Sequence, residues 1–184
     1  MAGYLHWCDF LDDDLLALAR HTVISNRINF IRSTVTTGLH DFRKSEVLWQ
    51  SFYQELYERF ACRLRGFHPH LRNAFPQLTD APGIEMQLTM HGDGEFFKRH
   101  VDDGAPETNH RLLTYVYYFS LTDAQQFTGG QLILETASGT YCIEPRHNTI
   151  VWFPAGCQHE VSPVNVPSHR WEDGRATING WLLR

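Results

Sequence analysis

The segment GEFFKRHVDDGAP, residues 94–106, places a histidine and an aspartate two positions apart, His100 and Asp102. Side chains alternate along a β-strand, so residues two apart point to the same face. An imidazole and a carboxylate on one face form either a hydrogen bond or two ligands of one metal ion. A chain with 11 histidines contains such a triplet roughly once by chance, so the rest of the sequence must decide. Asp103 is expected to point to the opposite face, as a loop residue.

A second histidine, His159, follows a Pro-Ala-Gly turn in WFPAGCQHEV and starts a new strand. Ferrous iron held by two histidines and one carboxylate needs such a second imidazole and keeps open positions for other ligands. A β-sandwich that returns this strand beside the one carrying His100 would complete the site. The alternative is an ordinary histidine at a strand edge.

The last predicted strand, GRATINGW, has a polar and an apolar face. The polar face carries Arg175, Thr177, Asn179 and Trp181. An arginine in mid-strand is costly to bury unless a carboxylate or phosphate meets its planar guanidinium. The alternative is a salt bridge to Glu160 or Asp173 on a solvent-facing sheet.

The strand LLTYVYYFS adds a second set of cavity-lining candidates, which comprises Thr114, Val116 and Tyr118. A phenol and a guanidinium directed at one pocket would bind a dicarboxylate. The sequence therefore predicts a metal site and an anion site in the same cavity.

Two kinds of element must position these residues. Up to residue 83 the apolar period is mainly helical, and two stripes are expected to cover a sheet: Leu15, Leu16, Ala19 and Val23 in the first, and Trp49, Phe52, Leu56 and Phe60 in the second. Residues 84–184 contain short β-branched and aromatic runs separated by turn residues. This order predicts an α+β domain, a jelly roll backed by N-terminal helices.

Length and composition are those of a single globular domain spanning residues 1–184. The net charge of −5 argues against a nucleic-acid partner, and no apolar run is long enough for a membrane span. The N-terminus lacks the pattern of a signal peptide. Four scattered cysteines suggest free thiols and a cytoplasmic protein, with a Cys142–Cys157 bridge left open. Nothing in the sequence specifies an oligomeric state.

These motifs, taken in order, resemble the 2-oxoglutarate- and iron(II)-dependent dioxygenases, and within them the prolyl 4-hydroxylase-like branch. GDGEFFKRHVD is similar to the segment carrying the His-x-Asp pair, TYVYYFS to the strand with the cosubstrate-binding tyrosine, and TGGQLIL to the strand after it. NTIVWFPAGCQHEVSPV resembles the strand pair of the distal histidine, and GRATINGW the arginine strand. The resemblance covers roughly residues 84–184, with a weaker part in the N-terminal half, and it implies a double-stranded β-helix.

The resemblance also implies roles for individual residues. His100, Asp102 and His159 would bind Fe(II). Arg175 and Tyr118 would bind the far carboxylate of the cosubstrate 2-oxoglutarate. Thr177 would assist, and Trp181 would lie near the metal pocket. The reaction would consume O2 and release succinate and CO2, with ascorbate as a stimulant, and the carboxylate of Asp102 would favour hydroxylation over halogenation.

Two departures from the branch concern Met90, which replaces a common tyrosine in one pocket wall, and the inserted segment NVPSHRWEDG, expected to be a loop. The segment DDGAPETNHR is expected to flank the metal as a loop. The branch places a prolyl residue in a peptide or protein first among substrates. The alternative substrate is a free amino acid or another small molecule. The alternative function is that of a non-catalytic jelly-roll module that binds a metal or another ligand.

Overall fold

The computed structural model describes residues 3–33, 42–78, 80 and 82–184. The helices are α1 (Asp13–Ser25), α2 (Gln54–Gly66) and α3 (His68–Ala74), with short 3-10 turns η1 (Arg27–Asn29), η2 (Gln50–Phe52) and η3 (Trp171–Asp173). The strands in the first part of the chain are β1 (Leu5–Cys8), β2 (Ile31–Arg32), β3 (Arg43–Lys44) and β4 (Glu46–Leu48). The later strands are β5 (Ile84–His91), β6 (Phe96–His100), β7 (Arg111–Phe119), β8 (Thr128–Gly129), β9 (Leu132–Thr136), β10 (Gly139–Ile143), β11 (Thr149–Pro154), β12 (His159–Val161), β13 (Val164–Asn165) and β14 (Arg175–Leu183).

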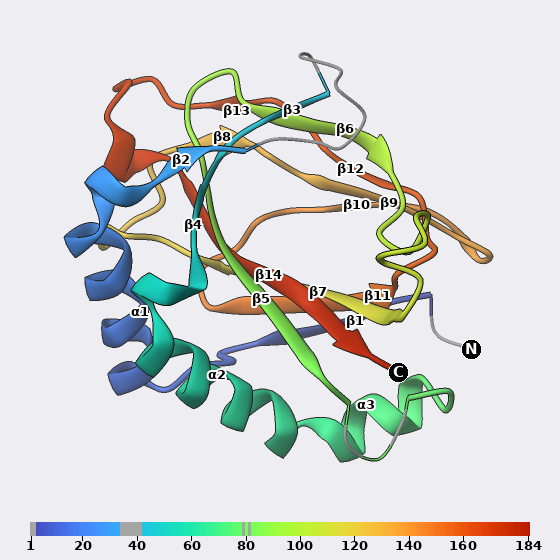
Figure 1. Cartoon of the computed structure of the whole chain (residues 1–184). Coiled ribbons are helices and arrows are strands. Elements are labelled where there is room, and N and C mark those ends of the chain that lie inside the picture. Colours follow the sequence, from blue (N-terminus) through green and yellow to red (C-terminus); the bar gives the residue numbers. More distant parts are fainter. Residues whose placement is uncertain (1–2, 34–41, 79, 81) are drawn as a thin grey trace.

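The strands form two facing sheets, which is the predicted jelly roll. The larger sheet has the order β1-β11-β7-β14-β5-β4-β2, and the smaller has the order β10-β9-β12-β6-β3. Strands β13 and β8 form a separate pair. The helices α1 and α2 lie along the outer side of the larger sheet, away from the smaller sheet (Figure 1).

Helix α1 begins where the sequence places its acidic run. The side chain of Asp12 accepts a hydrogen bond from the Leu15 backbone N–H at 2.9 Å, which is an N-cap. Asp13 and Asp14 occupy the first turn, where the helix dipole favours negative charge. The predicted apolar stripe of this helix is buried as expected.

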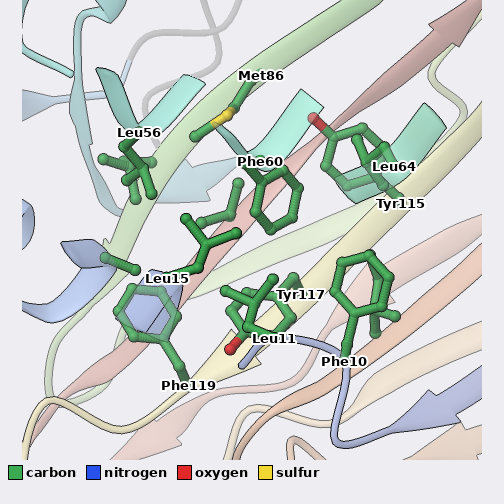
Figure 2. Packing of buried hydrophobic residues seen from close by; sticks show 14 of the residues in the cluster. Phe10, Leu11, Leu15, Leu56, Phe60, Leu64, Met86, Tyr115, Tyr117 and Phe119 are labelled. Carbon is green, nitrogen blue, oxygen red and sulfur yellow. The ribbon is translucent and has the colours of Figure 1, made fainter. Parts of the chain in front are cut away.

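The main hydrophobic core lies between the helices and the larger sheet. Helix α2 directs Leu56, Phe60 and Leu64 toward the strand β7, whose Tyr115 and Tyr117 face them (Figure 2). The ring centroid of Phe60 lies 5.9 Å from that of Tyr115 and 5.7 Å from that of Tyr117. This packing fixes β7, and β7 carries one wall of the candidate site on its other face.

The prediction of one helical stripe from Trp49 to Phe60 is wrong in its first part. Residues 46–48 form β4, which pairs with β5, and α2 begins only at Gln54. Trp49 is 61% exposed and Phe52 is 44% exposed, so neither belongs to the core. These residues form a strand and not a helix because pairing with β5 buries Val47 and Leu48. The first part of the chain therefore supplies edge strands to both sheets as well as helices.

A second core lies between the two sheets and supports the site. It comprises Val116, Tyr118, Leu132, Leu134, Ile143, Val151 and Phe153. The predicted alternation is confirmed in β14, since Ala176, Ile178 and Leu182 belong to the other core, on the helical side. All four cysteines are free thiols, so Cys142 and Cys157 are not bridged. No helix in the described part of the chain is long and apolar enough to cross a membrane.

Candidate active site

His100 and Asp102 lie at the end of strand β6, on the smaller sheet. His100 is the last residue of the strand, and Asp102 follows in a bend. The Asp102 backbone N–H donates to the Ala155 carbonyl at 2.9 Å, so the bend is tied to the turn after β11. Strand alternation therefore does not extend to Asp102 as predicted, and this tie to Ala155 helps hold the bend in place.

His159 starts strand β12, as predicted, and is the register partner of His100 on β6. Its Nε2 lies 3.4 Å from Asp102 Oδ2, and His100 Nε2 lies 3.6 Å from Asp102 Oδ1. One donor atom from each of the three residues lies within 4.8 Å of the other two. The structure thus brings together three side chains from two separate segments.

Backbone carbonyls orient both imidazoles. His100 Nδ1 contacts the Lys98 carbonyl at 2.8 Å, and His159 Nδ1 contacts the Cys157 carbonyl at 3.0 Å. A carbonyl only accepts hydrogen bonds, so each Nδ1 carries the proton and each Nε2 presents a lone pair. In this tautomer the lone pair of each ring is on Nε2, the nitrogen near the Asp102 carboxylate. A metal ion shared by the three residues requires this tautomer.

Asp102 is buried among these groups and remains ionised. Its Oδ2 accepts a hydrogen bond from the Thr114 hydroxyl at 2.6 Å. Burial alone would raise the pKa of the carboxyl, but the His100 contact and the adjacent His159 and Thr114 hold it well below its ordinary value. Burial lowers the pKa of His159, which favours the neutral imidazole that binds metals. Sequence reasoning placed Thr114 only as a lining residue and missed this bond.

Arg175 lines the same cavity and has no acidic partner among the residues that the structure describes. It is only 2% exposed, and its Nε has no hydrogen-bond partner among those residues. Its Nη1 lies 3.4 Å from His91 Nδ1. The alternative of a salt bridge to Glu160 or Asp173 is wrong, because Glu160 pairs with Arg99, and Asp173 contacts Ser168 and Arg170.

Tyr118 is buried beside Arg175 but is not among the residues that line the cavity. The Arg175 guanidinium carbon lies 5.0 Å from the centroid of its ring, and the phenol oxygen has no hydrogen-bond partner among the described residues. Burial raises the pKa of Tyr118 and lowers that of Arg175. An unpartnered buried guanidinium nitrogen and phenol suit an incoming carboxylate, which accepts from both.

Thr177 and Trp181 are on the face of Arg175, as predicted, but differ in their surroundings. Thr177 is 1% exposed, and its hydroxyl lies 3.4 Å from the Thr89 carbonyl. Trp181 lines the cavity, and the Arg111 guanidinium carbon lies 3.4 Å from its ring centroid. Thr177 is thus part of the strand layer, and Trp181 is a cavity wall.

Three further expectations concern residues outside the cavity. Met90 belongs to the helical-side core, so its replacement of a tyrosine leaves the pocket wall untouched, and Gln87 of the same strand lines the cavity. The carboxylate of Asp103 lies beside the turn at Gly156, away from the metal ligands. The inserted segment 165–174 is a connection that contains the turn η3.

Sequence reasoning also missed two residues that the fold adds to this region. His91 on β5 is buried beside Arg175, and alternation along β5 could have placed it there. Arg43 on the two-residue strand β3 lines the cavity with His100 and Asp102, and no periodic pattern marked it. The cavity between the sheets has a volume of about 60 Å³.

The residues present fit ferrous iron and a dicarboxylate. Two imidazoles and one carboxylate form the donor set typical of non-haem iron oxygenases. The unpartnered Arg175 Nε and Tyr118 hydroxyl are buried polar atoms that a carboxylate would satisfy. Apolar lining from Phe97, Val116, Leu132 and Val161 limits the access of water.

Comparison with known proteins gives the same assignment. Residues 86–183 match the family model of the 2OG-Fe(II) oxygenase superfamily. An uncharacterised PKHD-type hydroxylase from Synechocystis is 34% identical over 175 residues. The match covers 88% of this chain and 56% of that protein, so the chain spans little more than half the length of this relative.

Two solved structures share the fold. A prolyl-4-hydroxylase from Pseudomonas putida superposes with a TM-score of 0.74 at 24% identity, covering 99% of this chain and 92% of that one. A prolyl hydroxylase from Trichoplax adhaerens, in complex with a hypoxia-inducible-factor peptide, gives 0.70 at 17% identity, covering 98% and 83%. With the family match over more than half of its residues, the chain belongs to the 2OG-Fe(II) oxygenase superfamily.

Proposed function

We propose that this chain is a 2-oxoglutarate- and iron(II)-dependent dioxygenase that hydroxylates an unactivated C–H bond, with a prolyl residue of a peptide or protein as its substrate. The observation that carries the proposal is the buried Arg175, which lies in the cavity of the His100, Asp102 and His159 cluster and has no acidic partner in the described part of the chain. A module that only binds a metal has no use for such an arginine. A cosubstrate with a second carboxylate does.

In this proposal the metal ligands, Thr114 and Arg175 each have a defined role. His100, Asp102 and His159 hold the iron, while Thr114 fixes the Asp102 carboxylate. When bound, ferrous iron supplies the oxidation chemistry, in which 2-oxoglutarate and O2 become succinate, CO2 and one oxygen atom transferred to the substrate C–H bond. Arg175 donates to the far carboxylate of the cosubstrate.

Three further residues support the site. The Tyr118 phenol donates to the carboxylate that Arg175 binds, since the phenol oxygen and the Arg175 Nε have no hydrogen-bond partner among the described residues and the two side chains are adjacent. Thr177 supports the arginine by anchoring its strand to β5. Trp181 forms part of the cavity wall.

The names of the relatives support the prolyl substrate. Both solved neighbours described above are prolyl hydroxylases, and one was solved with a peptide. We further propose that residues 1–184 act as one catalytic unit, with residues 84–184 as the jelly-roll core and the first 83 residues as mainly helical support. The pairing of β1 with β11 and of β4 with β5 supports this unity. Four free thiols support a reducing compartment such as the cytoplasm.

The test is succinate formation. Purified protein is incubated under air with ferrous iron, ascorbate and 2-oxoglutarate, alone and with proline-containing peptides or free amino acids. We expect succinate above that of a His159→Ala variant, and a gain of one oxygen atom by mass in a prolyl peptide. Absence of succinate under every condition would favour the non-catalytic binding module. Oxygen gain in free amino acids alone would favour the small-molecule alternative.

A further inference from the structure

A second arginine, Arg43, reaches the cavity from the edge of the smaller sheet. Strand β3 pairs with β6 so that Arg43 is the register partner of Phe97. The Arg43 guanidinium carbon lies 4.9 Å from the centroid of the Phe97 ring, and the side chain lines the cavity with His100 and Asp102. Other residues bind iron and 2-oxoglutarate in the proposed function, so Arg43 has no role in binding either of them.

The hydrogen bonds of Arg43 hold it in place without neutralising it. Its Nε donates to Ser45 Oγ at 2.9 Å and its Nη2 donates to Gln87 Oε1 at 3.1 Å. Both acceptors are neutral, and a guanidinium has more N–H donors than these contacts use. In the part of the chain that the structure describes, Arg43 forms no ion pair with a carboxylate. Burial lowers its pKa to about 10, and the charge of Asp102 opposes that shift, so Arg43 is still protonated at neutral pH.

The loaded cavity holds one more positive than negative charge. Ferrous iron and doubly ionised 2-oxoglutarate carry equal and opposite charge, and metal-bound imidazoles are neutral. The two cavity arginines, Arg43 and Arg175, then share the single carboxylate of Asp102, whose charge acts on Arg43. An excess positive charge among buried residues is unfavourable, and a carboxylate with geometry matching the guanidinium is the usual partner.

We propose that Arg43 binds a carboxylate of the substrate, with the free amide N–H groups of Gln87 as additional donors. This inference rests on the proposed function and narrows its substrate to one that presents a carboxylate near the oxidised carbon. The carboxylate belongs to a free amino acid, to the C-terminal residue of a peptide, or to an acidic side chain beside the target residue. Phe97 and Val161 line both the cavity and a groove of about 340 Å³ across β6 and β12, which gives the rest of the substrate a path outward.

Matched pairs of probes test the proposal by binding rather than turnover. The protein is loaded with zinc, which does not support oxidation, and with 2-oxoglutarate. Titration calorimetry then compares L-amino acids with their amides, proline-ending peptides with their C-terminal amides, and Glu-Pro with Gln-Pro peptides carrying blocked termini. We expect at least one acid to bind at least about tenfold more tightly than its neutral partner, as one charge-assisted contact provides. The pair that shows the preference identifies the source of the carboxylate.

Variants then assign the preference to Arg43. Arg43→Gln should remove it, and Arg43→Lys should retain part of it, while both keep the affinity for 2-oxoglutarate. Arg99→Gln is the matched control, because Arg99 is on the same strand pair but contacts Glu135 and Glu160 at the surface, and it should behave as the wild type. If wild-type protein binds every acid and its amide equally, or if the preference survives in Arg43→Gln, the proposal is wrong.

The two levels of the account fail separately. Loss of the proposed function would show as no 2-oxoglutarate binding and no succinate formation by the wild type. The acid-against-amide comparison can also be made on the zinc-loaded protein without 2-oxoglutarate, where zinc and Arg175 attract carboxylates too, so the difference between wild type and Arg43→Gln decides. If Arg43→Gln does not fold, Arg43→Lys decides with 2-oxoglutarate bound: a weakened preference for acids supports the proposal, and an unchanged preference contradicts it.

Discussion

His100 and His159 face each other across the antiparallel strands β6 and β12, with ring centroids 4.1 Å apart. Each ring donates a hydrogen bond from its Nδ1 to the backbone carbonyl two residues earlier, so both Nε2 atoms face the site as possible metal ligands. Asp102 lies against both rings from the bend that follows β6. Cross-strand pairing therefore sets the relative positions of the two imidazoles, which lowers the cost of ordering the metal ligands.

Replacement of Arg175 should separate cosubstrate binding from metal binding. Arg175→Met keeps an apolar stem of similar length and removes the charge-assisted contacts to the far carboxylate. Each such contact contributes about 1.5–3 kcal/mol, so affinity for 2-oxoglutarate should fall about a hundredfold. Metal affinity should stay within about twofold, because the arginine is not a ligand. Calorimetric titration measures both, and unchanged 2-oxoglutarate affinity would remove the role assigned to Arg175.

The position of the Arg175 side chain depends on Gly130, which packs against its aliphatic carbons. A Cβ added to Gly130, whose φ is +66°, would lie 2.6 Å from Arg175 Cδ. Gly94 has a similar φ of +70°, but a Cβ there would meet no atom within 4 Å. Both Gly→Ala variants should lose about 1–2 kcal/mol of stability from backbone strain. Only Gly130→Ala should also lose about tenfold in 2-oxoglutarate affinity, and equal affinities in the two variants would contradict this packing role.

Arg111 should contribute more to stability than a typical surface arginine. It stacks on Trp181, donates to Glu85 Oε2 at 3.0 and 2.6 Å, and contacts the Asp102 carbonyl at 3.3 Å. Its side chain is 17% exposed, so these contacts are only partly screened. Arg111→Ala should lower the free energy of unfolding by about 2 kcal/mol. The exposed Arg99 is the control, with an expected loss of about 0–1 kcal/mol in urea denaturation, and an equal loss in both variants would be the contrary result.

Buried His91 makes stability depend on pH. Burial, with Arg175 and Arg43 nearby, holds its pKa well below the ordinary 6.5. In the unfolded chain the imidazole binds a proton as the pH falls through about 6.5, whereas the folded protein resists it, so the free energy of unfolding should decrease. The slope from this group is at most about 1.4 kcal/mol per pH unit. His91→Gln keeps a hydrogen-bonding side chain without titration and should flatten the curve, and an unchanged slope would exclude His91 as its source.

The site was predictable where strand alternation and order along the chain suffice. GRATINGW places Arg175 and Trp181 on the face opposite Ile178, and β14 has that arrangement. The turn before His159 marked the start of β12, as observed. These patterns are local, and the larger sheet preserves the alternation of β14 because each of its faces packs against a different core.

The remaining features come from tertiary pairing. Arg43 enters the cavity through the two-residue strand β3, whose place is set by its partner β6. In the sequence, Trp49 and Phe52 continue the helical period of α2. In the structure, the residues before them form β4, which pairs with β5, and the helix begins only at Gln54. The partner strands β6 and β5 lie far along the chain from β3 and β4. Local periodicity alone could therefore neither place Arg43 in the cavity nor locate the start of α2.

The most direct test of the account is the stoichiometry of iron binding in two neighbouring aspartate variants. Anaerobic equilibrium dialysis of chelator-treated protein with ferrous iron should give one ion per wild-type chain. Asp102→Asn should bind at least about a hundredfold more weakly, because the charged ligand is lost. Asp103→Asn should bind as the wild type, since its carboxylate lies at the Gly156 turn. Tight binding retained by Asp102→Asn, or lost in Asp103→Asn, would contradict the assignment of the metal site.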